Sequence, residues 1–333
     1  MRYKKLLLVV LSIVTIIVAI GIGSVYVSPY EIIKIIIQKI TNNNDEISAI
    51  SIGIIWNLRF PRVILAFLIG SMLSVSGTVM QSVLKNPLAS SYTLGVSAGA
   101  ALGVAVFVSL GIHIAFLGMF MLPLIGLISG IATVILAVTF ASKMDKYLEN
   151  NTIVLIGMVF SLFINALLTL ISALSDDTLQ RMIRWQMGSF ALKDWSFVLA
   201  SVPFAVVGIT YIMRYSTEMD NLTFGEDAAY VVGIDVKKVK WILLSVSSAL
   251  TGCAVAMVGI IGFVDLIAPH VIRRVFGSKH RVVIPMAALF GGIFMVAADC
   301  IARTIISPSE LPIGAVTALI GAPFFAYIYF KKR

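Results

Sequence analysis

Few ionisable residues interrupt the long apolar runs of this sequence, and they are the first candidates for chemistry. Asp299 and Arg303 are four residues apart, so on a helix their side chains lie on one face and are close enough to pair. Asp265 follows the stretch GIIGFV, where an apolar run breaks. An ionisable group inside a membrane-spanning run is costly and usually functional. The site must therefore be sought where the surrounding elements place these residues.

The sequence lacks the common motifs of enzymes. It contains no GxxxxGK[ST] phosphate loop, no HExxH or GxSxG motif and no paired carboxylates in a soluble stretch. His113, His270 and His280 are too scattered to indicate a metal site, and we interpret them as solvated or backbone-bonded groups. Cys253 and Cys300 stand singly in apolar runs and are interpreted as small core residues. We therefore expect no catalytic residue, no metal, no directly bound cofactor and no ATP hydrolysis by this chain alone.

An ion-coupled secondary transporter or channel is one alternative class of function. Such a protein would place carboxylates near the middle of its spans, and the second to sixth apolar runs have none at their centres. It would also lose uptake when the ion gradient collapses at constant ATP. A membrane enzyme or an assembly scaffold is a further alternative, and it would need a reactive constellation that the motif search does not supply.

The elements that must position these residues are membrane spans. The chain has 333 residues, 59% apolar and 12% charged, with a mean hydropathy of +1.03, whereas roughly a quarter of the residues are charged in an ordinary soluble domain. These values exclude a disordered chain, a disulfide-stapled secreted module and a typical cytosolic enzyme. They predict an all-α membrane protein, a polytopic bundle of about ten transmembrane helices.

Apolar runs long enough to cross a bilayer core of about 30 Å locate the expected spans. The first runs from Leu6 to about Val27, and we interpret it as a retained helix because it lacks an AxA-like cleavage site and further spans follow. The others lie near 61–82, 93–110, 114–141, 152–174, 195–214, 239–261, 266–276, 283–305 and 311–330. The run at 266–276 is too short to cross alone, and it is interpreted as a half-helix joined to the end of the preceding span.

The basic residues of the short loops predict the orientation. With the N-terminus in the cytoplasm, most of the 25 Lys and Arg residues fall on the inner side, among them Lys85, Lys143, Lys146 and the C-terminal KKR (331–333). Basic residues favour the cytoplasmic side because they translocate poorly. Both termini are therefore expected in the cytoplasm.

Between Ser28 and Leu58 we expect an external segment. Its first part, SPYEIIKIIIQKI, predicts an amphipathic helix that either lies on the outer surface of the membrane or packs against the protein. The tract TNNNDE (41–46) predicts a solvated turn. Elsewhere, glycines at four-residue spacing predict close helix packing. They are Gly95, Gly99 and Gly103 in one run and Gly126 and Gly130 in the next.

The longest cytoplasmic loop, roughly Tyr215 to Lys238, has the pattern of a compact projection. Its centre predicts a short helix from Glu226 to Val232, with acidic residues in the first turn and with Gly225 and Gly233 as boundaries. Two short helices joined by a glycine make a rigid knob. In a chain without its own energy source, such a knob indicates a docking site for a separate motor, and an ordinary connecting loop is the alternative interpretation.

From Arg59 the sequence reads RFPRVILAFLIGSMLSVSGTVMQSVLKNPLASSYTLGVSAGA, which resembles the signature of the iron-chelate and vitamin B12 uptake permease family of bacterial ABC importers. Five further elements follow in the family's order. They are WQMGSF at Trp185, FGEDAAYVVGI at Phe224, GIIGFVDLIAPHVIRR at Gly259, AADCIAR at Ala297 and ELPIGAVTALIGAPFF at Glu310. Together they cover most of the chain from residue 59 to 325, whereas the first 58 residues carry little family signal.

The resemblance implies a single transmembrane permease domain over residues 1–333, with the family-matching core at 59–325 and a cytoplasmic coupling loop at 215–238. It implies ten helices per subunit, a second permease subunit that is an identical copy or a paralogue, two cytoplasmic ATPase subunits that use ATP, and an extracytoplasmic substrate-binding protein. The implied location is the bacterial cell membrane, and no nucleic acid is involved. The implied cargo is an iron chelate, siderophore or haem, with vitamin B12 as the alternative, because selectivity rests largely with the binding protein.

Residue-by-residue matching to the family pattern implies three sets of site residues. Coupling to the ATPase falls on Phe224, Gly225, Glu226, Ala228, Ala229 and Gly233. Docking of the binding protein, by arginines that face acidic residues on its lobes, falls on Arg59, Arg62 and Arg303. The translocation path falls on Asn165 in the fifth span and on Pro312 and Gly314 in the tenth, where Pro323 also loosens the helix.

One position departs from the family pattern. Where the family usually has glycine in FVGL, this sequence has Asp265. Three interpretations of this carboxylate remain open: it pairs with a cation, it stabilises a helix N-terminus, or it faces the outer vestibule.

Overall fold

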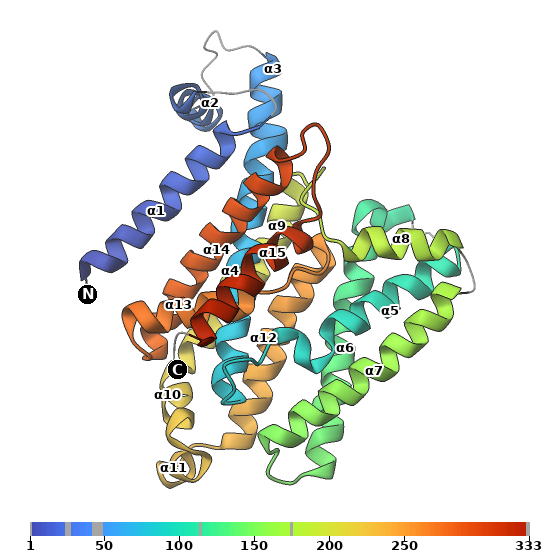
Figure 1. The fold of residues 1–333 in the computed structure, drawn as a ribbon, viewed down its shortest axis with the longest axis vertical. Helices are drawn as coiled ribbons and strands as arrows, with labels where there is room; N and C mark the ends of the chain where they lie inside the picture. The colour runs from blue at the N-terminus through green and yellow to red at the C-terminus, as the bar shows by residue number, and fades with distance from the viewer. Residues whose placement is uncertain (1, 24–27, 42–48, 113–114, 174–175, 331–333) are drawn as a thin grey trace.

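The computed structural model describes residues 2–23, 28–41, 49–112, 115–173 and 176–330. The chain forms a helical bundle with α2 and α3 at one end and α10 and α11 at the other (Figure 1). Seven of the described helices are long and apolar enough to cross a membrane, and two of these spans, those of α4 and α6, begin before the α-helix itself, at Gly53 and Gly118. They are α1 (Arg2–Gly21), α4 (Phe60–Val83), α6 (Met121–Met144), α7 (Asn150–Ala173), α9 (Trp195–Arg214), α12 (Val236–Val258) and α14 (His280–Thr304).

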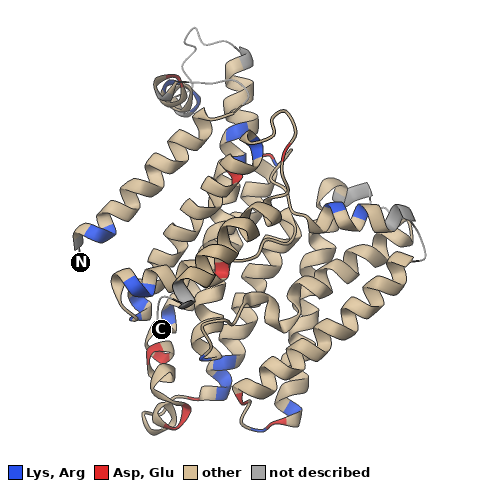
Figure 2. Cartoon of the chain, in the orientation of Figure 1, with Lys and Arg blue, Asp and Glu red and all other residues tan. Residues whose placement is uncertain are grey.

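Three shorter helices occupy the remaining predicted runs, so the predicted all-α membrane bundle is confirmed. They are α5 (Val96–Ser109), α13 (Val264–Phe276) and α15 (Ile313–Phe330). Smaller elements connect the long helices. They are α2 (Pro29–Thr41), α3 (Ala49–Ile52), η1 (Gly53–Arg59), η2 (Ser91–Leu94), η3 (Ala115–Phe120), α8 (Asp176–Gln186), α10 (Ser216–Phe224) and α11 (Glu226–Val231). Lys and Arg lie mainly at the ends of the long helices (Figure 2).

Some boundaries differ from the predicted ones. The second long helix starts earlier than residue 61, because the π-helical turn η1 continues directly into α4. The helix predicted from 114 begins only at Met121, after the 3₁₀ turn η3, whose Gly118 is not helical. The short run after α12 forms a separate helix, α13, because residues 259–263 break the chain direction. The helix α8 was not predicted at all.

Helix α4 is the centre of the bundle, and it packs against α14, α13, α12 and α9. Its glycines let backbones touch where lipid offers no hydrophobic drive for association. A side chain on Gly70 would meet the carbonyl of Gly291 in α14, and one on Gly77 would meet the carbonyl of Asp265 in α13. The three helices α4, α13 and α14 are therefore held at backbone contact distance.

Replacing Gly77 by leucine should destabilise the protein by about 3 kcal/mol, because even its Cβ has no room against α13 and overpacking of a tight core costs about that much. The midpoint of thermal unfolding in detergent measures the effect. The control is Gly53→Leu, since nothing lies within 4 Å of a Cβ at that position. Equal midpoints for the two variants would contradict the close contact of α4 and α13.

The predicted glycine stripes pack as expected. Gly99 and Gly103 of α5 face Thr133 and Ser129 of α6, and Gly130 of α6 faces the backbone of α5 in return. Gly126 also lies against α5 and against Trp185. At the start of α5, Gly95 has a φ of +82°, a left-handed conformation that favours glycine.

The segment between α1 and α4 contains the predicted amphipathic helix. Ile32 and Ile35 of α2 are buried, whereas Tyr30, Ile33 and Ile37 are exposed, so α2 packs against α1 and η1 through one face. The turn predicted at TNNNDE lies, beyond Thr41, outside the described residues, as do His113, the end of the first predicted span at 24–27 and the C-terminal KKR.

Candidate coupling and docking sites

The predicted knob is formed by α10 and α11 at the lower end of the bundle (Figure 1). The two helices meet at Gly225, whose φ of +130° and ψ of 154° are accessible essentially to glycine alone. Gly233, with a φ of +83°, ends the second helix and donates its N–H to the carbonyl of Tyr230. The predicted helix and both of its glycine boundaries are thus confirmed.

The knob has an anchored side and an apolar exposed side. Met219, Leu222 and Ala229 are buried against the bundle. In contrast, Phe224 is 82% exposed and Val231 is 87% exposed. Large apolar side chains exposed at a loop tip are typical of a surface that a partner protein covers.

Two buried basic side chains hold the knob to the bundle. Lys240 of α12 donates to Glu226 Oε1 at 2.7 Å and to the carbonyl of Leu148 at 2.8 Å. His280, the first residue of α14, lies 2.6 Å from Asp220 Oδ1 through Nδ1 and 2.6 Å from Ser82 Oγ through Nε2. The interpretation of His280 as solvated or backbone-bonded is therefore wrong, because its ring is buried between two side chains.

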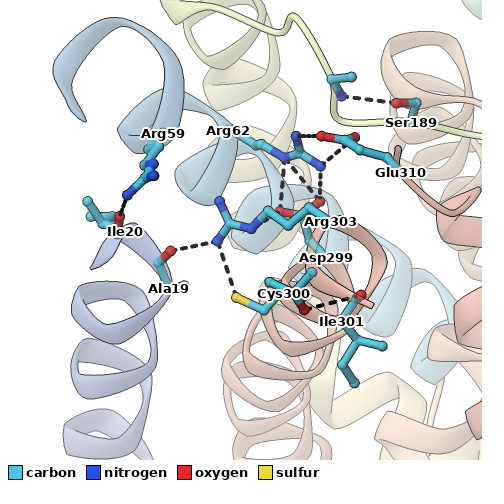
Figure 3. Close-up of polar contacts among 12 residues, drawn as sticks. Ala19, Ile20, Arg59, Arg62, Ser189, Asp299, Cys300, Ile301, Arg303 and Glu310 are labelled. Atoms are coloured by element: carbon cyan, nitrogen blue, oxygen red, sulfur yellow. Dashed lines mark hydrogen bonds and ion pairs between the residues drawn. The ribbon is translucent and has the colours of Figure 1, made fainter. Parts of the chain in front are cut away.

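At the opposite end, Arg62 and Arg303 lie against two carboxylates, and Arg59 lies to one side of them, beside the end of α1 (Figure 3). Arg62 of α4 donates to Asp299 Oδ1 at 2.8 Å and to Glu310 Oε1 at 2.6 Å. Arg303 Nε lies 3.7 Å from Asp299 Oδ2, which confirms the pairing predicted from their four-residue spacing. The Asp299 side chain is only 2% exposed, so two guanidinium groups compensate one buried carboxylate.

Arg59 and Arg303 also fasten the end of α1 (Figure 3). Arg59 Nη1 donates to the carbonyls of Ile20 and Gly21, each at 3.3 Å, and Arg303 Nη2 donates to the carbonyl of Ala19 at 2.5 Å. The last carbonyls of a helix have no partner within it, and they carry partial negative charge that favours cations. The three arginines predicted to dock a binding protein thus also hold α1, α4 and α14 together.

A cavity of about 430 Å³ lies beside this cluster. Its charged lining comprises Arg59, Arg62, Arg303, Lys193, Asp194 and Glu310. Lys193, in the loop before α9, lies 4.0 Å from the centre of the Phe197 ring. Burial lowers the pKa of Lys193 to about 8, although the nearby Asp194 carboxylate opposes this shift.

Asp265 lies in the first turn of α13 and is 1% exposed. Its Oδ2 accepts hydrogen bonds from Ser90 Oγ at 2.5 Å and from the N–H of Ser91 at 3.0 Å. Of the three interpretations, the position at a helix N-terminus is the one that the structure supports. The outer vestibule is wrong because the side chain is buried.

Comparison with known proteins identifies the family. A model of the FecCD transport family matches residues 10–331. The chain belongs to this family. It is 41% identical over 281 residues to an uncharacterized ABC transporter permease protein of Bacillus subtilis, with 84% of this chain and 80% of the relative covered.

Further relatives of this FecCD permease are named for different substrates. A cobalamin import system permease protein of Halobacterium salinarum is 37% identical over 275 residues, covering 83% of this chain and 73% of the relative. A hemin transport system permease protein of Yersinia pestis is 34% identical over 285 residues, covering 84% of each chain. A solved inward-facing structure, assigned to a metal-chelate type ABC transporter, matches with a TM-score of 0.87 at 28% identity, covering 99% of this chain and 100% of that chain.

As a FecCD permease, the chain is a non-catalytic, multi-pass membrane subunit of a bacterial ABC importer. ATP is hydrolysed by a partner ATPase, and an extracytoplasmic binding protein is the other implied partner. In the described residues, no group of three or more His, Cys, Asp or Glu side chains is placed to hold a metal ion.

The residues predicted for the translocation path lie in two separate parts of the FecCD permease, on α7 and at the start of α15. Asn165 is exposed on α7, next to the exposed side chains of Leu162 and Phe163. Gly314, in the first turn of α15, packs against the carbonyls of Ile260 and Met187. Pro312 directly precedes α15, and Pro323 lies within it.

Sequence reasoning missed the basic residues that fasten the knob. Lys240 belongs to none of the motifs in the sequence, and His280 is predicted to be solvated or backbone-bonded. A lysine at the start of a long apolar run is usually a solvated or snorkelling group, so no local pattern distinguishes a buried one. Cys253 is a buried core residue as predicted, whereas Cys300 is half-buried and its Sγ accepts from Arg303 at 3.2 Å.

Proposed function

We propose that this permease moves an iron chelate, a siderophore complex or haem, into the cytoplasm. The hemin transport permease among its relatives and the metal-chelate type assigned to the solved structure support this cargo. Vitamin B12 is the second candidate, supported by the cobalamin permease at a similar identity. The chain acts as one transmembrane domain, with its core at residues 59–325.

The observation that carries the ATP-driven part of the proposal is the apolar knob. Its exposed Phe224 and Val231 form the surface on which the ATPase docks, and the movement of that ATPase displaces the bundle. The remaining coupling residues shape this surface or hold it in place. They are Gly225, Glu226, Ala228, Ala229 and Gly233.

At the opposite end, the binding protein docks over the cavity that Arg59, Arg62 and Arg303 line, where its acidic side chains meet guanidinium groups that keep their bonds within this chain. Support comes from their clustering around one cavity, where Lys193 adds a fourth positive charge. A guanidinium group pairs with carboxylates in two-pronged geometry, which gives docking a defined orientation.

Docking should weaken by about two- to fivefold between pH 7 and pH 9, the range expected for the loss of one partly exposed charge contact. Lys193 is mostly charged below its pKa of about 8 and mostly neutral above it, so raising the pH removes a positive charge from the cavity. Titration of the binding protein onto the reconstituted permease measures the affinity. Lys193→Arg should abolish the pH dependence, and an unchanged dependence in that variant would exclude Lys193 as its source.

The path runs along the faces of α7 and α15, at Asn165, Pro312 and Gly314, between this subunit and a second permease that is an identical copy or a paralogue.

Reconstitution tests the function directly. Proteoliposomes with the permease, its ATPase and its binding protein should accumulate ferric siderophore or haem only with ATP, and cobalamin should not compete. Accumulation without the ATPase would refute the coupling. Uptake that stops when an ion gradient is collapsed at constant ATP would favour an ion-coupled transporter instead. Preferential uptake of cobalamin would replace the proposed cargo by the second candidate.

A further inference from the structure

The two acidic residues that hold the knob stand on either side of its glycine joint. Asp220 belongs to α10 and Glu226 to α11. Each carboxylate meets a basic side chain of the bundle, His280 and Lys240 respectively. The knob is thus attached at two points with Gly225 between them.

The first attachment, which we name the α10 clamp, consists of Asp220, His280 and Ser82. Asp220 Oδ1 accepts a hydrogen bond from the backbone N–H of His280 at 2.9 Å and also lies 2.6 Å from Nδ1 of the same residue. This carboxylate therefore caps the start of α14 and holds the imidazole ring in place. The other ring nitrogen reaches Ser82 near the end of α4. Arg273 of α13 donates to the same Ser82 Oγ at 3.0 Å. A single carboxylate on α10 is therefore linked to α14, α4 and α13.

The second attachment, the α11 clamp, consists of Glu226, Lys240 and Leu148. The Lys240 side chain is 0% exposed, and its ammonium group is bonded both to Glu226 and to the carbonyl of Leu148. Leu148 has a φ of +55°, a conformation rarely adopted by a residue with a side chain. Its loop ends at α7, which begins at Asn150. The α11 clamp thus joins the second knob helix to α12 and to the segment that leads into α7.

Buried polar pairs fix position more strictly than apolar contacts do. Apolar side chains slide past one another at small cost, whereas a buried ammonium or imidazole left without its partner is strongly unfavourable. A displacement of α10 or α11 must therefore carry the clamped residues with it or break a buried polar contact.

We propose that the two clamps are the positioning residues that transmit movement of the knob to the bundle, the α10 clamp to α4, α13 and α14 and the α11 clamp to α12 and α7. This inference rests on the proposed docking of the ATPase at the knob. A single displacement of the knob is thus passed to both of these groups of helices. In this role neither basic residue contacts a partner protein. His280 acts through Asp220, and Lys240 acts through Glu226.

The test measures molecules imported per ATP hydrolysed in proteoliposomes that contain the complete importer. Lys240→Met should lower this ratio at least fivefold while the ATPase still co-purifies at wild-type stoichiometry. The matched control is Lys238→Met, two residues earlier in the same helix and exposed, which should leave the ratio unchanged. Asp220→Asn should lower the ratio in the same way.

Two further measurements separate transmission from mere stability. If the clamps were purely structural, the substitutions would lower the yield and the thermal stability of the protein. The complexes that do assemble would still import the wild-type number of molecules per ATP hydrolysed. That result would overturn the proposal. If Lys240→Met does not fold, Glu226→Gln replaces it, because this variant keeps the shape of the side chain. A pair of spin labels at the exposed positions Val232 and Tyr147 measures the distance across the α11 clamp. With the wild-type clamp this distance should be the same with and without nucleotide. In the Lys240→Met or Glu226→Gln variant it should change when nucleotide binds.

Val231→Arg distinguishes failure of the clamps from failure of the docking proposal. This exposed change touches neither clamp and should abolish retention of the ATPase. If retention is lost in Val231→Arg while Lys240→Met and Asp220→Asn keep the wild-type ratio, the clamps are refuted and the docking surface stands. If Val231→Arg retains the ATPase and full uptake, the docking surface is wrong and the clamp proposal falls with it.

Discussion

Gly225→Val should reduce ATP-driven uptake at least tenfold. At a φ of +130° and a ψ of 154°, a β-branched residue is strained by roughly 1–3 kcal/mol, and the chain can relieve this strain only by rotating α10 relative to α11. Such a rotation changes the position of the exposed Phe224 relative to the exposed Val231. The ATPase would then meet a surface of the wrong shape.

Uptake of radiolabelled cargo into proteoliposomes, normalised to the inserted permease, measures this effect. Gly53→Val is the matched control, because Gly53 has no positive φ and no neighbour within 4 Å of its Cβ position. Undiminished uptake in Gly225→Val, with the protein folded and inserted, would show that the joint between α10 and α11 has no part in coupling.

Asp299→Ala should destabilise the protein by about 3 to 5 kcal/mol, the range for removing one partner of a buried ion pair. The variant leaves Arg62 and Arg303 facing each other without the carboxylate that separates them. Glu310→Ala should cost only about 1 kcal/mol, since its side chain is one-third exposed and solvent screens the pair.

Thermal or denaturant unfolding of the purified permease, followed by tryptophan fluorescence, gives both values. The conservative Asp299→Asn should fall between the two alanine variants, because an amide keeps hydrogen-bond acceptance but lacks the charge. Equal effects of Asp299→Ala and Glu310→Ala would mean that burial does not decide the strength of this cluster.

Most of the fold was predictable because each span is a continuous apolar run. Such a run can be recognised in the sequence without knowing which helices pack against it. Helix α8 was missed for the same reason. Its sequence, DDTLQRMIRWQ, is polar overall and amphipathic, so it does not register as a span. The early start of the second long helix was also hidden, since residues 53–59 form a wider helical turn whose periodicity differs from that of an α-helix.

The sites divide in a similar way. The pairing of Asp299 with Arg303 follows from their spacing on one helix, whereas the pairing of Arg62 with Asp299 joins residues 237 positions apart and leaves no local pattern. The knob was predictable from its glycines and acidic first turn. Its clamps were not, because the burial of Lys240 and His280 is decided by helices that pack around them.

The fastening of α1 has a consequence for the synthesis of the protein. The carbonyls of Ala19, Ile20 and Gly21 receive their donors from Arg59 and Arg303. At roughly 5–20 residues per second, the ribosome needs on the order of tens of seconds between making the end of α1 and making Arg303. Until then the carbonyl of Ala19 lacks the donor that Arg303 later supplies, so the end of α1 is fully fastened to the bundle only after α14 has been made.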